Sequence, residues 1–535
     1  MPWAPAFLAA LSRGAGGVEW VLRAARHASG RSPFSPTRWD THRVVSPPVI
    51  SGASVALTSW QAAGSSCTLG LGLEGVQRAA HYPLARGTLA EVVCRYRPTP
   101  YGPVSEEVVF RGAVESVVVQ GYAATVGLRD LVGVARARPR VDSGGDLFSL
   151  YDGYNNVSEV ATSTWTVAST SLNTATNVTT SGSVTSGGSI FGLAYIEPLS
   201  GAPFYIYHST GGTSANTLTN GGGIFPAAFG SIPVNAAVGS RVTTLPGFYA
   251  HPISTVQRIL ATGGAGATDV WDAAGLPSTW GVGLHPAWRD DRSFNAARSI
   301  MVASGVSYVG GLAPSEQRYP LQWLSGLLAP WGAWLVCSQG EVGVRVAVDP
   351  QRSRPPAVWG GRRIGPHEVV AMRPSDITPG EVPAQARYAR VYTGWPQTYG
   401  DAVQYGIGDG WPSHTGDSRT GVVTDYTSTD ISAWVGPLRG ASASDAEAIA
   451  EEVATRIAGW TARVPVVYDV VCTLAAAGLA AGDWCRLGPG LPYWSRTRRN
   501  ADAVTVMVLS VSEDWGRGQV ALRLAELPPD SAKRP

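Results

Sequence analysis

The eight histidines are the side chains best suited to bind a metal, so their spacing decides whether the sequence predicts a metal site. No two of them have the H-x-x-x-H spacing that places two imidazoles on one face of a helix. The acidic segment 401–417 contains aspartate and glycine, but not at the regular ligand spacing of a calcium loop. The sequence therefore predicts no metal site. The histidines interpreted as core or surface residues are His27, His42, His81, His208, His251, His285, His367 and His414.

Acid–base hydrolysis of a sugar would need two carboxylates that flank the substrate, and adjacent acidic residues occur at 106–107, 290–291 and 451–452. Neighbouring residues on a strand or a helix point in different directions, so none of these doublets forms such a pair. Carboxylates far apart in the sequence could still meet in the fold. The chain has no G-x-S-x-G motif, and Cys337 lies in an apolar run typical of a buried thiol. The sequence thus predicts no catalytic residue and no enzyme activity.

The segment 263–268, GGAGAT, has the composition of a phosphate-binding loop. In such loops the glycines follow a strand and open a helix, so that the first helical amides face the phosphate. Here the glycines follow a predicted helix over 253–261, in which Val256, Ile259 and Leu260 recur on one face. Glycines in that place end a helix, and no Gly-Lys-Ser/Thr follows them. We therefore predict no phosphate, nucleotide or other cofactor site.

The composition of this 535-residue chain indicates several domains with frequent turns. Charged residues make up only 15% of it, whereas 64 glycines and 38 prolines are present. The 19 tryptophans, against four methionines, indicate rigid aromatic packing and large interfaces. A formal net charge of +2 provides no overall attraction to nucleic acid or to a membrane.

Targeting signals and cysteine usage both favour a protein made in a reducing compartment. The short apolar patch 7–11 has no basic region before it, so a secretory signal is not expected. No segment approaches the ~20 apolar residues that a membrane-spanning helix needs. The five cysteines are odd in number, widely spaced and without a C-x-x-C pair, which favours free thiols. A bridge between Cys67 and Cys94 stays open as an alternative.

Short alternating or β-branched segments predict strands along most of the chain. The segment 18–27 is instead expected to be a helix with a basic end, interpreted as a solvated helix or docking arm rather than a nucleic-acid site. Further helices are expected at 316–330 and 441–463, and a long loop at 399–428. The expected strands are 44–45, 54–57, 67–71, 90–96, 107–112, 114–119, 123–128, 190–196, 204–208, 333–337, 342–346, 387–392, 464–474, 482–487, 504–511 and 519–524.

Several short motifs resemble the tail-tip, or baseplate, hub proteins of long-tailed, siphovirus-like bacteriophages. The helix at 253–261 and its glycine turn are followed, over 269–284, by the pattern D-x-W-D … L-P-x-x-W-G-x-G-L. The segment EEVVFRGAVESV at 106–117 resembles the first barrel of that family. The pattern G-D … V-x-x-V-S-x-D-x-x-x-G-x-V-x-L-x-L, over 482–524, is similar to the closing domain of many tail proteins. The resemblance covers most of 41–524 in domain order.

The resemblance implies a multidomain α+β fold that is predominantly β, with two barrel-like hub domains. A small all-β domain is inserted between them, and a helix-plus-strands domain closes the chain. The expected parts are an N-terminal helical arm (1–40), a first β-barrel-like hub domain (41–144), an inserted Ser/Thr/Gly-rich β domain (145–250), an α+β domain (251–350), a second β-rich hub domain (351–440), a closing domain (441–527) and a tail (528–535).

The function implied is that of a structural virion component, a homotrimer whose two barrel-like domains per chain form a pseudo-sixfold ring. Such a hub joins the tail tube or distal tail ring to fibres or a spike, and it contacts the tape measure protein. It closes the tail channel until infection, when DNA passes through, and it acts in host attachment and genome ejection. The resemblance implies no cofactor, no stable membrane insertion, and assembly in the host cytoplasm into the distal end of the tail.

Three alternatives stay open. A distal tail ring protein would have sixfold rather than threefold copy number. A carbohydrate-binding adhesin of the tail tip or cell surface is favoured by the Ser/Thr/Gly-rich block and by tryptophans that could stack on sugars, within 145–245 or the 399–428 loop. A polysaccharide-degrading enzyme would have to release reducing ends from a host capsule or wall.

Overall fold

The protein is predominantly β, as the sequence predicts. Mostly apolar residues, chiefly valine and leucine, face inward at alternate positions of several of its strands, which is the pattern of a sheet with one buried face. None of its described helices is long and apolar enough to span a membrane. The computed structural model describes residues 7, 18–26, 38–56, 61–72, 84, 86–99, 102–134, 163–170, 177–180, 192–197, 204–209, 217–225, 241–245, 247–261, 284, 288–303, 309–312, 328–348, 355–375, 385–393, 403–407, 428–434, 466–491 and 504–526.

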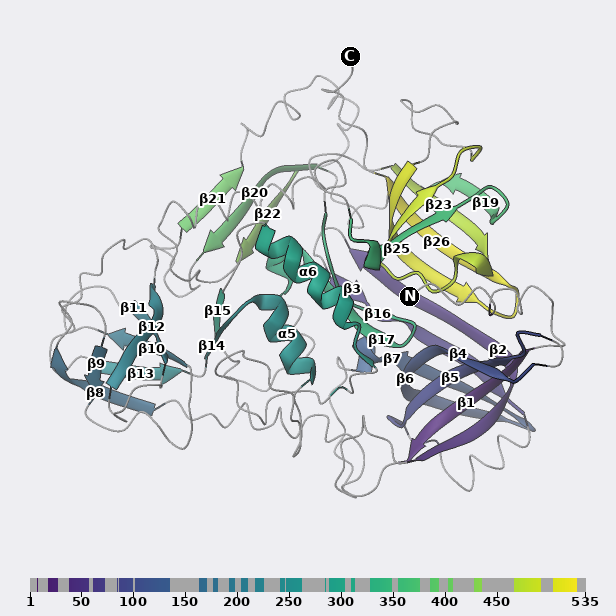
Figure 1. The fold of residues 1–535 in the computed structure, drawn as a ribbon, viewed down its shortest axis with the longest axis horizontal. Coiled ribbons are helices and arrows are strands. Elements are labelled where there is room, and N and C mark those ends of the chain that lie inside the picture. The colour runs from purple at the N-terminus through teal and green to yellow at the C-terminus, as the bar shows by residue number, and fades with distance from the viewer. Residues whose placement is uncertain are drawn as a thin grey trace, which may run out of the picture.

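Six described strands near the N-terminus pair in a closed cycle, which we call the N-terminal unit. They are β1 (Val18–Arg26), β2 (Arg38–Ala56), β4 (Ser66–Leu71), β5 (Leu89–Tyr96), β6 (Ser105–Gln120) and β7 (Ala123–Asp130). The order around the cycle is β1-β5-β6-β7-β4-β2, and β2 pairs again with β1. All of these pairings are antiparallel. This unit lies at the lower right of Figure 1, in purple and blue.

A second set of six described strands, the C-terminal unit, lies at the upper right of Figure 1. Its strands are β18 (Gly360–Ile364), β19 (Val369–Pro374), β23 (Val466–Thr473), β24 (Trp484–Leu487), β25 (Val504–Asp514) and β26 (Gln519–Glu526). They follow the order β18-β24-β25-β26-β23-β19, in which only the β18–β24 pair is parallel. No described strand pairs with the outer edge of β19.

The two units repeat one pairing scheme. By its place in the order of pairing, each strand of one unit has a counterpart in the other. The pairs of counterparts are β1 and β18, β2 and β19, β4 and β23, β5 and β24, β6 and β25, and β7 and β26. The last hairpin of each unit agrees in detail, because a β-bulge follows Val114 in β6 and Val508 in β25. Pairing resumes at Ser116 in the first hairpin and at Ser510 in the second. The order of six paired strands therefore occurs twice in the chain, although β18–β24 is parallel where β1–β5 is antiparallel, and only the N-terminal unit is closed, by the β1–β2 pairing.

The two units are joined edge to edge by β2 and β25, so that thirteen of the described strands belong to one sheet. Residues 49–54 of β2 pair with residues 510–514 of β25. One edge of β25 pairs with β26. The other edge pairs with β24 along the first part of β25 and with β2 along its last part. This sheet runs across the predicted first hub, second hub and closing domains, whose boundaries stay predictions.

Smaller assemblies lie between the units in the sequence. Six described strands close into a barrel in the order β10-β11-β12-β9-β8-β13, at the left of Figure 1. The strands predicted at 190–196 and 204–208 are confirmed as two of its members. The strands of this part of the chain are β8 (Ser163–Thr170), β9 (Asn177–Thr180), β10 (Gly192–Glu197), β11 (Phe204–Ser209), β12 (Thr217–Phe225), β13 (Arg241–Leu245), β14 (Gly247–Ala250), β15 (Val309–Leu312), β16 (Ala333–Ser338), β17 (Glu341–Val346), β20 (Gln385–Thr393), β21 (Val403–Ile407) and β22 (Ser428–Trp434), and β3 (Gln61–Ala63) adds to β2.

Two helices and a hairpin occupy the centre of the molecule (Figure 1). The helix predicted at 253–261 is confirmed, and the described helices are α3 (Leu131–Val134), α5 (Pro252–Ala261) and α6 (Asp291–Ala303). The α6 helix begins where the Asp290 carboxylate accepts the Ser293 N–H at 3.2 Å, as an N-cap does. The predicted β16–β17 hairpin is also confirmed. Its turn residues, Gln339 and Gly340, have φ values of 51° and 75°, as a tight two-residue turn requires.

The predicted helix at 18–27 is wrong, because residues 18–26 form strand β1. Trp20, Leu22 and Ala24 are buried at alternate positions and belong to the core of the N-terminal unit. Residues such as Glu, Leu, Arg and Ala favour helices locally, but pairing with β5 on one edge and β2 on the other outweighs that preference.

The predicted loop at 399–428 is also wrong in part, because β21 lies within it and pairs with β20. The segment is polar and rich in glycine, so its own sequence does not predict a strand. Pairing with β20 stabilises β21 instead. The predicted helix at 441–463 lies outside the described residues. So does most of the predicted helix at 316–330, whose described end contains the 3-10 turn η5 (Ala329–Trp331).

Candidate assembly site at the junction of the two units

Glu513 is a buried acid on β25, placed opposite Ile50 of β2 and Val520 of β26. Its carboxylate oxygens accept hydrogen bonds from the Gly478 N–H at 2.7 Å and from the Trp515 indole N–H at 3.0 Å. One side chain thus connects the loop before β24 and the β25–β26 turn to the strand that carries the junction.

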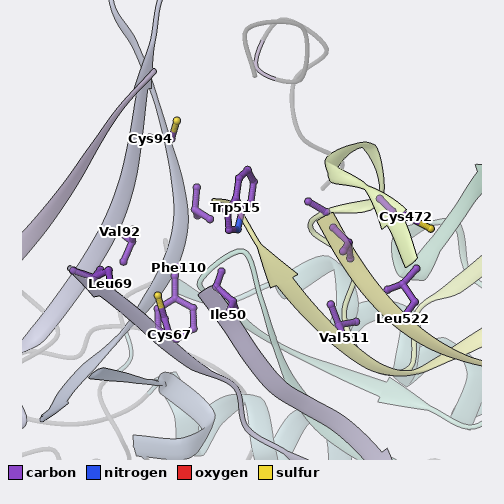
Figure 2. Packing of buried hydrophobic residues seen from close by; sticks show 14 of the residues in the cluster. Ile50, Cys67, Leu69, Val92, Cys94, Phe110, Cys472, Val511, Trp515 and Leu522 are labelled. Atoms are coloured by element: carbon purple, nitrogen blue, oxygen red, sulfur yellow. The ribbon is translucent and has the colours of Figure 1, made fainter. Parts of the chain in front are cut away.

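Trp515 carries the aromatic contact between the units. Its backbone N–H donates to the Pro48 carbonyl of β2 at 3.2 Å. Its ring lies 5.3 Å from that of Trp20, edge to face, and 6.0 Å from that of Phe7, measured between ring centroids. Only 5% of Trp515 is exposed, and Figure 2 shows it between the buried side chains of the two units. The turn of the C-terminal unit therefore inserts an aromatic anchor into the core of the N-terminal unit.

Burial raises the pKa of Glu513 to about 7, against the opposing effect of its two hydrogen bonds. A carboxyl group whose pKa is higher in the folded than in the unfolded chain binds more protons when folded. The folded chain binds more protons than the unfolded chain at pH values between the ordinary pKa of 4.5 and the raised pKa of about 7. The contribution of Glu513 to stability is therefore complete below pH 4.5 and is lost as the pH rises through 7.

We expect Glu513 to lower the free energy of unfolding by about 3 kcal/mol between pH 4.5 and pH 8. Denaturant unfolding of the wild type and of Glu513→Gln across this range measures the effect. Glutamine cannot titrate, so the stability of the wild type relative to that of Glu513→Gln should fall as the pH rises. Glu19→Gln, at an exposed position of β1, is the matched control. A wild-type minus Gln difference that does not change with pH would contradict this assignment.

A second buried cluster ties the β16–β17 hairpin to the C-terminal unit. The Arg345 guanidinium lies 2.7 and 2.8 Å from one carboxylate oxygen of Asp483, through two of its nitrogens. The other Asp483 oxygen accepts the Ala480 N–H at 2.9 Å. Burial raises the pKa of Asp483, although Arg345 opposes this shift. The pair joins β17 to the residue that precedes β24.

The Ser293 hydroxyl extends this cluster to helix α6. It is a hydrogen-bond partner of the Arg345 guanidinium at 2.7 Å and of the Trp359 indole N–H at 3.2 Å. It also bonds the backbone N–H and carbonyl of Val344. Trp359 ends the 3-10 turn η6 (Ala357–Trp359), which leads directly into β18. One oxygen thus connects α6, β17 and the start of the C-terminal unit.

Both clusters are excluded from solvent, since Glu513, Asp483, Arg345 and Ser293 are all buried. Buried polar groups that bond to one another hold elements in one relative position and present nothing to a substrate. The arrangement is therefore suited to joining parts of the molecule rigidly rather than to catalysis.

The five cysteines are free thiols, and Cys67 and Cys94 are not bonded to each other. Cys67, Cys94, Cys472 and Cys485 are buried on strands of the two units. Burial raises the pKa of each of these thiols and that of Cys337 on β16. A raised pKa disfavours the thiolate, so none of the five has the environment of a nucleophile.

The described histidines lie on different elements. His42 is buried on β2, whereas His251 precedes α5 and its Nδ1 accepts the Ile253 N–H at 3.2 Å. Burial, together with the nearby Arg298, lowers the pKa of His251 to about 4. Within the described ranges, no group of three or more His, Cys, Asp or Glu side chains is arranged to hold a metal ion.

The acidic doublets at 106–107 and 290–291 lie on separate elements and bond to neighbouring side chains. Glu106 on β6 binds Arg95 at 2.8 Å and also pairs with Arg23. Asp291 accepts a hydrogen bond from the Gln257 amide at 2.7 Å. The doublet at 451–452 lies outside the described residues. The described doublets therefore stabilise the fold locally.

Sequence reasoning predicted none of the residues in the two buried clusters. Arg345 interrupts an apolar strand and Asp483 follows a glycine before another, and each pattern can indicate a buried ion pair. No local signal links two residues so far apart in the chain. The tip tryptophan, Trp515, follows two acidic residues and is typical of an exposed turn until its tertiary partners are known.

No family model matches the chain, and no curated protein matches it. Among solved structures, it is similar to the 43 kDa tail protein of prophage MuSo2 from Shewanella oneidensis, at 9% identity over 95% of this chain and 98% of that one, with a TM-score of 0.34. It is similar to prophage tail protein gp18 of Listeria monocytogenes EGD-e at 6% identity, 96% coverage of both chains and a TM-score of 0.33. A chain of the half-lidded Francisella PdpA–VgrG complex is 5% identical, with 97% of this chain and 59% of that chain covered and a TM-score of 0.33. All three TM-scores are below 0.5, so the function proposed next rests on the pairings and motifs of this chain itself.

Proposed function

We propose that this chain is a structural hub at the distal end of a virion tail, where it joins the tail tube or distal tail ring to fibres or a spike. The observation that carries the proposal is the repeat of one order of six paired strands within a single chain. Two alike units per chain allow a homotrimer to present six alike positions to a sixfold tube. The sequence motifs at 251–284 and 482–524 support the same assignment.

The junction between the units suits a component that must keep its shape while forces pass along a tail. The β2–β25 pairing makes one sheet of both units, and Trp515 is held in the N-terminal core. The Arg345 and Ser293 cluster fixes the central hairpin and α6 against the C-terminal unit. In this proposal the ring closes the channel before infection, and the tape measure protein and DNA pass through it without stable membrane insertion.

Immunogold labelling tests the location. Serum raised against 163–245, the separate barrel at the left of Figure 1, should label purified particles at one tail end. The purified chain, captured on the same grids, controls for access of the serum to its epitope. Particles that carry no label while the purified chain is labelled would exclude a tail-tip role.

Copy number separates the hub from its neighbour in the tail. Peptide quantification on purified particles should give three copies per particle for a hub, whereas six would select a distal tail ring protein. Binding of the purified chain to a glycan array, in the absence of particle labelling, would favour the adhesin instead.

A further inference from the structure

Two arginines of the C-terminal unit face each other on neighbouring strands. Arg363 of β18 lies directly opposite Arg486 of β24 in the parallel β18–β24 pair. Residues that lie opposite each other in paired strands point to the same face of the sheet, and the strands are about 4.8 Å apart. The next residues on the two strands, Ile364 and Leu487, are buried in the core. The two guanidinium groups therefore share the outer face of the sheet.

Neither of these exposed arginines is neutralised by an acid. Within the described residues, no ion pair or hydrogen bond is made by either side chain. The carboxylate in the turn after β18, Glu368, already accepts the Gly365 N–H at 2.9 Å and pairs with Arg362 at 3.5 Å. Like charges that lie opposite each other on neighbouring strands repel and destabilise the pair. An anion bound between the two guanidinium groups would remove this repulsion.

A hydroxyl group continues the row onto the next strand. Thr505 of β25 lies opposite Arg486 in the antiparallel β24–β25 pair, so its side chain points to the same outer face. The neighbouring residues on that face of the two strands, Trp484 and Met507, are buried. The three residues Arg363, Arg486 and Thr505, which we call the arginine row, thus lie at the boundary between a covered and an exposed part of this face.

Two glycines leave space beside the arginine row. A Cβ atom on Gly488 would lie 3.4 Å from the Arg363 Nε, so this arginine extends over Gly488. A Cβ atom on Gly365 would lie 2.8 Å from the Cε1 atom of the exposed His367, whose ring lies over that glycine. The same position on Gly488 is 3.5 Å from the Gly365 Cα, so the imidazole is a neighbour of the row. Guanidinium, hydroxyl and imidazole groups therefore surround one small area of the outer face.

The groups of the arginine row match a phosphate group better than a carboxylate. A carboxylate has two oxygens, and the fork of a single guanidinium is sufficient to bind both. A phosphate monoester has three strong acceptor oxygens and a charge of about −1.5 to −2 at pH 7. Two guanidinium groups and a hydroxyl on three successive strands provide donors for three separate oxygens, and they provide two positive charges.

We propose that Arg363, Arg486 and Thr505 bind a terminal phosphate group, the chemistry that inorganic phosphate and phosphate monoesters share, with His367 at the rim of the site. The site differs in kind from the glycine segment 263–268, for which the sequence predicts no phosphate binding. Strand side chains, rather than the first amides of a helix, hold the anion here. The inference does not depend on the proposed tail role, and particle labelling has no bearing on it.

Phosphorus NMR titration of the full chain with inorganic phosphate, at constant ionic strength, tests the site. Arg363→Gln and Arg486→Gln should each weaken binding by at least about tenfold, because each removes hydrogen bonds to a charged group. Arg43→Gln is the matched control, since Arg43 is exposed on β2 and lies opposite Val21 rather than a second arginine. A wild type that does not bind phosphate, or an equal loss in the Arg43 control, overturns the inference.

Two conservative variants separate a shaped site from general positive charge. Arg486→Lys keeps the charge but not the guanidinium fork, so it should bind phosphate more weakly than the wild type. Thr505→Val keeps the shape and removes the hydroxyl, which should weaken binding by about two- to tenfold. If both variants bind phosphate as tightly as the wild type, the three-donor arrangement is wrong.

The choice of phosphate compound identifies the source of the group. Glycerol phosphate that binds at least as tightly as inorganic phosphate identifies a monoester as the ligand, whereas binding of inorganic phosphate alone identifies the free ion. Dimethyl phosphate has only two free oxygens and one charge, so it should bind at least about tenfold more weakly. A diester that binds as tightly as the monoester contradicts a site for three oxygens.

Thermal unfolding provides a second, independent readout. Phosphate should raise the unfolding temperature of the wild type more than that of Arg363→Gln/Arg486→Gln, because only the wild type binds the ligand when folded. Phosphate also stabilises proteins in general by exclusion from their surface, so the difference between the two proteins is the quantity to compare. Without phosphate, the double variant should be at least as stable as the wild type, since the like-charge pair is gone. An equal rise in both proteins overturns the inference.

Discussion

Trp515→Ala is expected to lower the free energy of unfolding by about 3–5 kcal/mol, the usual cost of deleting a buried tryptophan. The substitution removes the ring that packs against Trp20 and Phe7. It also removes the indole N–H bonded to Glu513. Because these partners belong to different units, the loss should weaken the junction itself. Urea unfolding at one protein concentration, followed by far-UV circular dichroism, measures the change.

Trp515→Phe distinguishes packing from hydrogen bonding at this position. Phenylalanine keeps much of the aromatic contact and loses only the N–H donor, so the loss should be clearly smaller than in the alanine variant. The alanine variant should also unfold in two transitions if the two units separate before either melts. An alanine variant as stable as the wild type would show that Trp515 does not hold the units together.

Arg345→Met is expected to cost about 3–5 kcal/mol, because it leaves the Asp483 carboxylate buried without its counter-charge. The same change removes a donor to Ser293 and so loosens the contact between α6 and the β16–β17 hairpin. Arg373→Met is the matched control, since Arg373 pairs with Asp469 at 3.4 Å on the surface. An exposed ion pair contributes about 0–1 kcal/mol, so this control should change stability little.

A double-mutant cycle makes the Arg345 prediction sharper. Arg345→Met combined with Asp483→Asn removes both charges, so the double variant should be more stable than the sum of the single losses predicts. Thermal unfolding at neutral pH provides all four stabilities. Equal losses in Arg345→Met and Arg373→Met, or strict additivity in the cycle, would contradict a buried, mutually dependent pair.

Local sequence was sufficient to predict most strands of the two units, because a strand with one buried face alternates apolar and polar residues along the sequence. The segments 67–71, 123–128 and 519–524 were predicted on this basis and are confirmed. The same reasoning failed at 18–26, where residues with helical preference form β1 between two partner strands. A strand that depends on its neighbours carries a weaker local signal than one that alternates strictly.

The candidate site needed the tertiary structure altogether. From the sequence alone, Glu513 and Trp515 are expected to be exposed residues at or beside a turn. Only their packing against β2 and Phe7 in the structure shows that both are buried. Likewise, nothing near Arg345 in the sequence points to Asp483. Burial and long-range ion pairs depend on which distant segments of the chain come into contact. These contacts cannot be derived directly from a single sequence.

The sequence by itself determined that this protein is predominantly β, that its glycines at 263–268 follow a helix, and that its cysteines suit free thiols. These properties depend on residue type and short-range spacing. Only the tertiary structure decided that one order of six paired strands occurs twice, because the two units share this order and the bulge of the last hairpin rather than sequence. It also decided that β2 covers the edge of β25, since hydrogen-bonded edges are completed by whichever segment lies beside them in space.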